Sequence, residues 1–153
     1  MPLYSNDTIG TILGKVKFPT ADEDRNLGTG EFDYTLQGGL TQNIRDFHVS
    51  GIVGRKFNGS SAQFPLDDVW KFSLGAGVNV TPGTAVGVDY DFRQSATATG
   101  DNVSEATAYV THNLASGWAV QLYTMTGFTD ASPNWGGGLQ LSYMLDSFEP
   151  HTR

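Results

Sequence analysis

Eight stretches of the chain alternate apolar and polar residues with a period of two. These stretches cover 8–18, 31–42, 47–57, 70–80, 84–94, 104–113, 118–128 and 135–145. Because successive side chains of a strand point to opposite faces, each stretch predicts a β-strand with one apolar and one polar face. The links between the stretches alternate long and short, which is typical of an antiparallel up-and-down β-barrel whose two rims differ.

Length and composition favour one β-rich domain. The chain has 153 residues, 19 of which are Gly, with 12% aromatic and 16% charged residues, a balance that suits closely packed strands and turns. We expect a single barrel domain over 1–153, with flexible tails at 1–7 and 146–153. The sequence contains no apolar run long enough for a transmembrane helix. A barrel strand that crosses a membrane needs only about 10 alternating residues.

Two further features narrow the function classes. The chain has no Cys, which excludes disulfides, thiol catalysis and thiolate metal sites. Its formal net charge is −7 and its nine Lys and Arg residues are scattered along the sequence. A phosphate-binding surface needs clustered cations, so we expect no nucleic-acid partner.

The strand pattern alone does not tell which face lies inside the barrel. In 70–80 the residues Trp70, Phe72 and Leu74 share one face, while Lys71 and Ser73 share the other. A soluble barrel turns its apolar face inward, and a membrane barrel turns it outward against lipid. In the soluble alternative, apolar side chains would line a cavity for an apolar ligand. These side chains are Tyr34, Leu36, Phe72, Leu74 and Leu122.

Aromatic residues of the apolar face lie at both ends of the predicted strands. Next to the long links are Phe18, Phe32, Trp70, Phe92, Phe128 and Trp135. Next to the short turns are Phe47, Trp118 and Tyr143. Two aromatic bands at opposite rims match the interfacial girdles of a membrane barrel, so the pattern favours a transmembrane type with a polar interior.

The polar face carries charges of both signs. We predict a lumen charge network made of Lys15, Lys17, Asp33, Lys71, Asp89, Asp91, Arg93 and Glu105. Lys56 lies on the same face. Because charges in a narrow lumen must be paired, the interleaved signs predict a lumen filled by its own ion pairs. Small residues such as Gly75 and Gly77 suit the tightly curved strands of such a barrel.

The three histidines give no metal-ligand pattern. His48, His112 and His151 are far apart in the sequence, and His48 and His112 fall on different strand faces. The acidic stretch from Asp22 to Asp24 lacks the spaced oxygen ligands of a Ca²⁺ loop, so we expect a solvated loop there. We expect no metal and no cofactor.

A pair of carboxylates offers the nearest approach to catalytic chemistry. Asp89 and Asp91 lie about 7 Å apart along one strand and could in principle act as acid and base. Interleaved cations such as Arg93 favour charge pairing over catalysis. We therefore expect the protein not to be an enzyme.

Four segments carry a resemblance to a known family. They are KFPTADED…LGTGEFDYTL at 17–36, DDVW at 67–70, VDYDFRQS at 88–95 and DASPNWGGGLQLSY at 130–143. With these segments the chain resembles the outer-membrane β-barrel transporter family of the phenol meta-degradation pathway type. The resemblance implies an outer-membrane location in a Gram-negative bacterium and passage of small, often aromatic or apolar compounds. Members of that family are generally longer, so the chain resembles their C-terminal two-thirds. The resemblance carries over no site residues.

The leading hypothesis is an outer-membrane β-barrel that passes or binds small hydrophobic or aromatic compounds. Its expected partners are the lipid bilayer, lipopolysaccharide and a small hydrophobic ligand. An eight-stranded barrel has an interior that side chains nearly fill, so we expect no open pore from eight strands alone. Two alternatives stay open, a soluble lipocalin-like or cyclase-like barrel that binds an apolar ligand, and a structural protein whose edge strands pair between copies.

Overall fold

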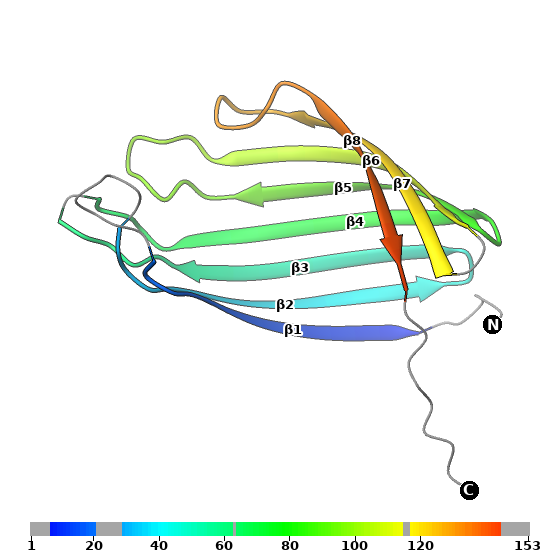
Figure 1. Cartoon of the computed structure of the whole chain (residues 1–153), viewed down its shortest axis with the longest axis horizontal. Helices are drawn as coiled ribbons and strands as arrows, with labels where there is room; N and C mark the ends of the chain where they lie inside the picture. Colours follow the sequence, from blue (N-terminus) through cyan, green and yellow to red (C-terminus); the bar gives the residue numbers. More distant parts are fainter. Residues whose placement is uncertain (1–6, 21–28, 63, 115–116, 145–153) are drawn as a thin grey trace, which may run out of the picture.

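The structure, a computed structural model, describes residues 7–20, 29–62, 64–114 and 117–144 (Figure 1). Within these residues the strands are β1 Thr8–Lys17, β2 Asp33–Ile44, β3 Phe47–Phe57, β4 Val69–Thr81, β5 Thr84–Arg93, β6 Val103–Asn113, β7 Trp118–Gly127 and β8 Gly136–Tyr143. Each predicted stretch coincides with one strand, so the all-β fold class is confirmed. The predicted flexible tails lie outside the described residues, apart from Asp7.

The strands form one antiparallel sheet in sequence order, from β1 to β8. This confirms the up-and-down topology. β2 extends to Ile44, so the first short link is only Arg45 and Asp46, shorter than predicted. Arg45 has a φ of 56°. A positive φ at the first position of a two-residue turn matches the twist of the flanking strands, which explains why the strands continue so far into the link.

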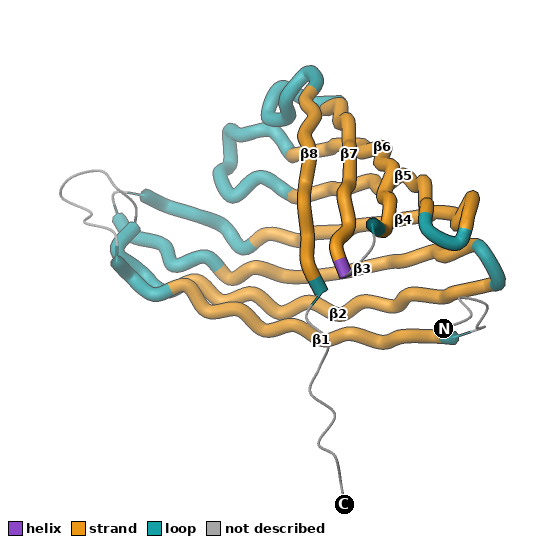
Figure 2. Tube along the Cα trace, turned by 45° about the vertical axis from the view of Figure 1, so that its right-hand side comes forward, coloured by secondary structure: helices purple, strands orange, loops and turns teal. Residues whose placement is uncertain are grey.

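The sheet is strongly curled. In both backbone views β7 and β8 cross in front of β3 and β4 (Figure 1, Figure 2). β1 and β8 are the two edges of the sheet, and within the described residues no pairing joins them. Closure of the sheet into a complete barrel therefore stays a prediction.

Glycines on the concave face let neighbouring side chains lie flat on the sheet. His48, Gly77, Gly87 and Tyr109 are successive cross-strand partners over β3 to β6. A Cβ atom on Gly77 would lie 2.3 Å from the His48 ring, and one on Gly87 would lie 2.3 Å from the Tyr109 hydroxyl. Nε2 of His48 and Oη of Tyr109 are 3.1 Å apart. The two glycines thus make room for a hydrogen bond that spans four strands.

The apolar side chains lie on the convex face and are exposed. Val69 is the one buried hydrophobic residue in the described part of the chain, at 2% exposure. The residues that the soluble alternative placed around a cavity are all exposed, namely Tyr34, Leu36, Phe72, Leu74 and Leu122. They share the face opposite to Lys71 and Arg93 in the strand register. These residues therefore do not enclose an apolar cavity on the inner side of the curled sheet, as the soluble alternative requires.

Candidate functional site

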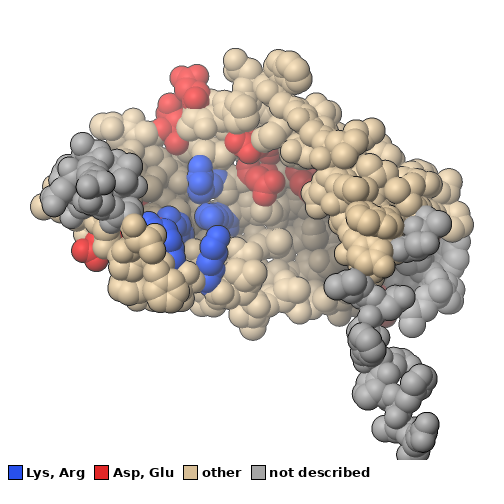
Figure 3. Space-filling model, viewed as in Figure 1, with Lys and Arg blue, Asp and Glu red and all other residues tan. Residues whose placement is uncertain are grey.

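Charged side chains of the concave face gather by sign into two neighbouring regions (Figure 3). The first region holds the cations Lys15, Lys17, Lys56, Lys71 and Arg93 around Asp33. The second region holds the carboxylates Asp89, Asp91 and Glu105 on β5 and β6. The register places all eight residues predicted for the lumen network on this one face.

Asp33 is the hub of the cationic region. Its carboxylate accepts from Lys56 Nζ at 2.9 Å, from Lys17 Nζ at 3.2 Å and from the backbone N–H of Gly59 at 3.0 Å. The Asp33 side chain is 5% exposed, whereas the side chains of Lys56 and Lys17 are 31% and 48% exposed. The register explains this arrangement, because Lys17 is the direct partner of Asp33 at the end of the β1–β2 pair.

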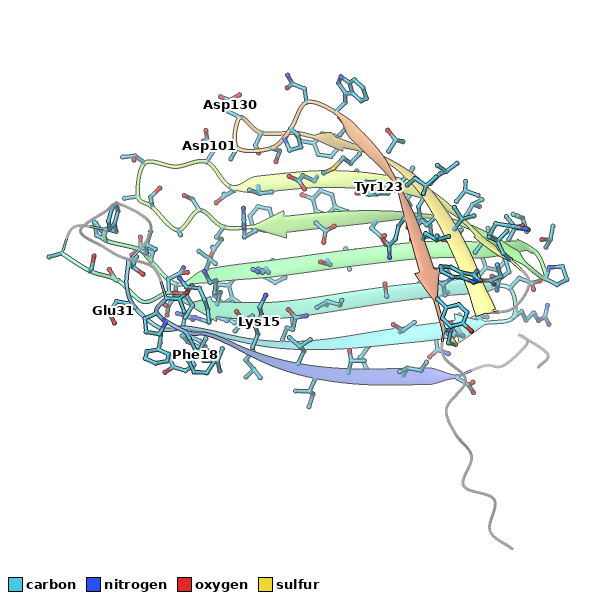
Figure 4. All side chains as sticks on the ribbon, in the orientation of Figure 1. Lys15, Phe18, Glu31, Asp101, Tyr123 and Asp130 are labelled. Atoms are coloured by element: carbon cyan, nitrogen blue, oxygen red, sulfur yellow. The ribbon has the colours of Figure 1, made fainter. Side chains whose placement is uncertain are left out.

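The cations line a groove of about 490 Å³. Its lining is Leu13, Lys15, Lys17, Asp33, Thr35, Gln37, Lys56, Lys71 and Arg93. Lys71 and Arg93 are direct cross-strand partners, and Lys15 and Lys56 flank Thr35 from its two sides. Figure 4 shows Lys15 over the sheet and Phe18 on the other side of the same strand end. Five strands therefore contribute to one cationic groove.

The acidic region has its own contacts. Asp91 accepts a short hydrogen bond from the Ser73 hydroxyl, and its direct partner on β6 is Glu105. Asp89 lies over Gly75, where a Cβ atom would meet its Oδ1. Among the described residues, no ion pair joins Asp89, Asp91 or Glu105 to a cation. The interleaved signs along the sequence thus become separate positive and negative regions in the sheet.

The described histidines form structural hydrogen bonds. His48 pairs with Tyr109 across the concave face, and Nδ1 of His112 lies 2.8 Å from the Thr84 hydroxyl. In the part of the chain that the structure describes, no three His, Asp or Glu side chains come together around a metal position. His151 and the stretch from Asp22 to Asp24 lie outside the described residues.

The aromatic side chains gather at both rims of the convex face. At the long-link rim, Phe18 and Phe32 have ring centroids 5.7 Å apart. At the short-turn rim, Trp118 and Tyr143 lie 4.9 Å apart. These contacts lie at the two rims for which the sequence predicts aromatic bands. Stacking and edge contacts of this kind favour ordered rings at each rim.

Arg55 is a rim residue that sequence reasoning did not single out. Its guanidinium lies 5.4 Å from the Phe57 ring centroid and 5.2 Å from that of Trp70. It also forms an ion pair with Asp68 at 3.2 Å. A cation on the apolar face of a strand was a sequence signal for such a contact, but Trp70 becomes its neighbour only through the β3–β4 register.

A second hollow lies on the convex face and is apolar. Its volume is about 740 Å³, and its lining includes Gly10, Gly38 and Gly51, with Ile12 and Leu74 among the walls. Gly10 and Gly51 lie on either side of Leu40 in the register, and Gly38 lies between Ile12 and Val53, so small residues alternate with large apolar ones along this surface. This hollow belongs to the same exposed apolar face as the aromatic rims.

The described residues thus form a single up-and-down sheet of eight antiparallel strands, apolar on the convex face and charged on the concave face. The profile of the family described as "Putative MetA-pathway of phenol degradation" matches residues 6–145, so the chain belongs to this family. The match confirms the family that the sequence resembles, whereas the correspondence to the C-terminal two-thirds of longer members stays a prediction. Comparisons with curated proteins and with solved structures found no match. Over the described ranges, no helix has the length and hydropathy of a membrane span.

Proposed function

We propose that this protein is an outer-membrane β protein whose convex face contacts lipid and whose charged concave face binds or passes small aromatic compounds. The observation that carries the proposal is the exposed apolar face. Large apolar side chains are exposed on all eight strands, while Val69 is the one buried hydrophobic residue among those described. An exposed apolar surface of this extent marks a surface that contacts a membrane or another apolar partner. Membership in a phenol-degradation family supports an aromatic compound.

The dimensions of the strands support a membrane position. The eight strands have between 8 and 13 residues, and a strand that crosses the hydrocarbon core needs about 9–11 residues. The aromatic contacts at Phe18 and Trp118 then lie at the two interfaces, where such rings are favoured. The long-link rim is the end proposed to face lipopolysaccharide. The proposal assigns no enzyme activity, metal or cofactor to the chain.

The open edges of the sheet set a requirement on this proposal. Backbone N–H and C=O groups must be paired inside a bilayer, so β1 and β8 must find partners there. The structural alternative, in which these edges pair between copies, makes a different prediction. Native mass measurement in detergent gives one chain per particle if β1 pairs with β8 of the same chain, and several chains per particle if the edges pair between copies.

A matched pair of lysine variants tests the lipid-facing surface. Leu74 is exposed on the convex face, and its neighbour Ser73 lies on the concave face beside Asp91. We expect Leu74→Lys to impair insertion into lipid vesicles, because a lysine on the lipid face of a barrel costs about 2–4 kcal/mol near the bilayer midplane. Ser73→Lys should insert like the unmodified protein. Equal insertion of both variants would refute the membrane position. The same conclusion would follow if the unmodified protein were monodisperse in detergent-free buffer with its Trp residues shielded.

Passage is tested separately from insertion. Vesicles that contain the protein should take up phenyl glucoside, a neutral aromatic solute that crosses pure lipid slowly, faster than protein-free vesicles of the same lipid. Faster uptake supports passage. Equal rates remove passage from the proposal and leave a membrane-bound protein that only binds such compounds.

A further inference from the structure

The distribution of cations in this chain is strongly uneven. The chain is acidic, with a formal net charge of −7 and only nine Lys and Arg residues. Five of these, including all four lysines, line one groove on the concave face. The carboxylate in the lining is Asp33. A cluster of five cations with one carboxylate therefore forms within an otherwise acidic protein.

Asp33 cannot neutralise the whole cluster. It already accepts from Lys17, Lys56 and the Gly59 backbone. Lys15, Lys71 and Arg93 form no ion pair with a carboxylate of the described residues. These three cations remain to attract an anion.

Two of the unpaired cations are held against each other by the fold. Lys71 and Arg93 are direct partners across β4 and β5. Direct partners have Cβ atoms about 4.5–5.5 Å apart, and like charges in this position are destabilising. An anion between them relieves the repulsion and accepts hydrogen bonds from both. Arginine suits this role because its planar donors match the two oxygens of a carboxylate.

The same row of the sheet gives the groove an apolar wall and an open floor. Leu13, Gln37, Gly54, Lys71 and Arg93 are successive partners across β1 to β5. Leu13 lies on the concave side among the lining residues. Gly54 is the partner of Gln37 and Lys71 and presents no side chain between them. The lysine stems add aliphatic surface beside the charged ends.

We propose that this groove binds a small aromatic carboxylate, with the carboxylate between Lys71 and Arg93 and the ring toward Leu13. The aromatic part of this inference rests on the proposed function, while the anionic part rests on the cation cluster alone. The ligand that we propose for the groove is therefore not a neutral hydrophobic compound. It combines a negative charge with an apolar body.

The class of ligand is tested by measuring binding to the unmodified protein in detergent micelles. Benzoate, benzyl alcohol and inorganic phosphate are titrated separately by calorimetry. We expect benzoate to bind at least about tenfold more tightly than benzyl alcohol, the ratio that corresponds to about 1.4 kcal/mol, and to bind more weakly as salt rises. Benzyl alcohol binding as tightly as benzoate overturns the anionic preference. Phosphate binding as tightly as benzoate overturns the aromatic carboxylate and points to a phosphate such as a lipid headgroup.

A pair of identical substitutions tests the position of the site. Arg93→Gln removes a groove cation, and Arg45→Gln removes a cation from the β2–β3 turn, outside the groove lining. We expect Arg93→Gln to weaken benzoate binding about tenfold or more, since a charge-assisted hydrogen bond is lost. Arg45→Gln should leave it within about twofold, because its charge is screened at that distance. Equal losses in both variants overturn the proposed site.

The micelle measurements separate this inference from the proposed function. If benzoate binding depends on Arg93 but the vesicle assay shows no solute passage, the result supports the anionic site and removes passage from the proposed function. If the vesicle assay shows passage but benzoate binds no more tightly than benzyl alcohol, the result supports passage and overturns the anionic site. Circular dichroism of each variant shows whether its β-sheet is intact, and the comparison of ligands on the unmodified protein does not depend on any variant.

Discussion

Replacing Asp33 by Asn tests whether one buried carboxylate organises the cationic groove. The substitution keeps the size of the side chain and one hydrogen-bond acceptor but removes the negative charge. In the native protein the carboxylate accepts from Lys56 Nζ at 2.9 Å, Lys17 Nζ at 3.2 Å and the Gly59 N–H at 3.0 Å. Asp33→Asn leaves both ammonium groups beside a neutral partner.

The size of the effect follows from the exposure of each partner. Lys56 is 31% exposed, so its charged hydrogen bond contributes about 1.5 kcal/mol, the low end of the range for such bonds. Lys17 is 48% exposed, which reduces its share to about 0.5 kcal/mol, as for a surface pair. The Gly59 bond loses about 0.5 kcal/mol, because an amide oxygen is a weaker acceptor than a carboxylate. We expect Asp33→Asn to lower the free energy of unfolding by about 2 kcal/mol, since removal of a buried charge returns part of the loss.

Urea unfolding in detergent micelles, followed by tryptophan fluorescence, measures this difference. Glu105→Gln is the matched control, because it makes the same chemical change on the same face. Glu105 stands opposite Asp91, so its neutralisation removes a like-charge contact and should leave stability unchanged or raise it by a few tenths of a kcal/mol. If Asp33→Asn and Glu105→Gln have equal stability, Asp33 does not hold the groove together.

Two further predictions concern the backbone of the sheet. Gly87→Ala should lower the free energy of unfolding by about 1–2 kcal/mol, because its Cβ would lie 2.3 Å from the Tyr109 hydroxyl and 2.8 Å from the Ala76 carbonyl oxygen, which forces Tyr109 away from His48. A double-mutant cycle with Tyr109→Phe checks this reason, and purely additive effects would contradict it. Arg45→Gly should raise the free energy of unfolding by up to about 1 kcal/mol, since the φ of 56° at this turn position is unstrained for Gly. Arg45→Ala is its control in the same urea titration and should show no gain.

The strands could be predicted from the sequence because the period-two pattern is a local property. The end of β2 was missed because a positive φ at Arg45 continues the ladder to Ile44, and nothing in the sequence marks a non-glycine residue for that conformation. Whether β1 pairs with β8 could not be predicted, because the alternating pattern of a strand does not show which strand lies beside it.

The charged site was predicted only in part, for a similar reason. The sequence places Asp89, Asp91 and Arg93 on one face, and their alternation suggested ion pairs between neighbours. The partners are decided by register instead, and the β4–β5 pair has a register shift between Asn79 and Thr81. Arg93 consequently stands opposite another cation, Lys71. A sequence gives the face of each charge but not the residue beside it on the next strand.

The location of the lysines allows the groove to be labelled chemically in the unmodified protein. Amine-reactive reagents modify lysine side chains and the chain's amino terminus. Since all four lysines line the groove, every lysine that such a reagent modifies lies on the concave face. A fluorophore or a crosslinker attached in this way reports on the occupancy of the groove in the native sequence, and protection of the lysines by a solute measures its binding directly.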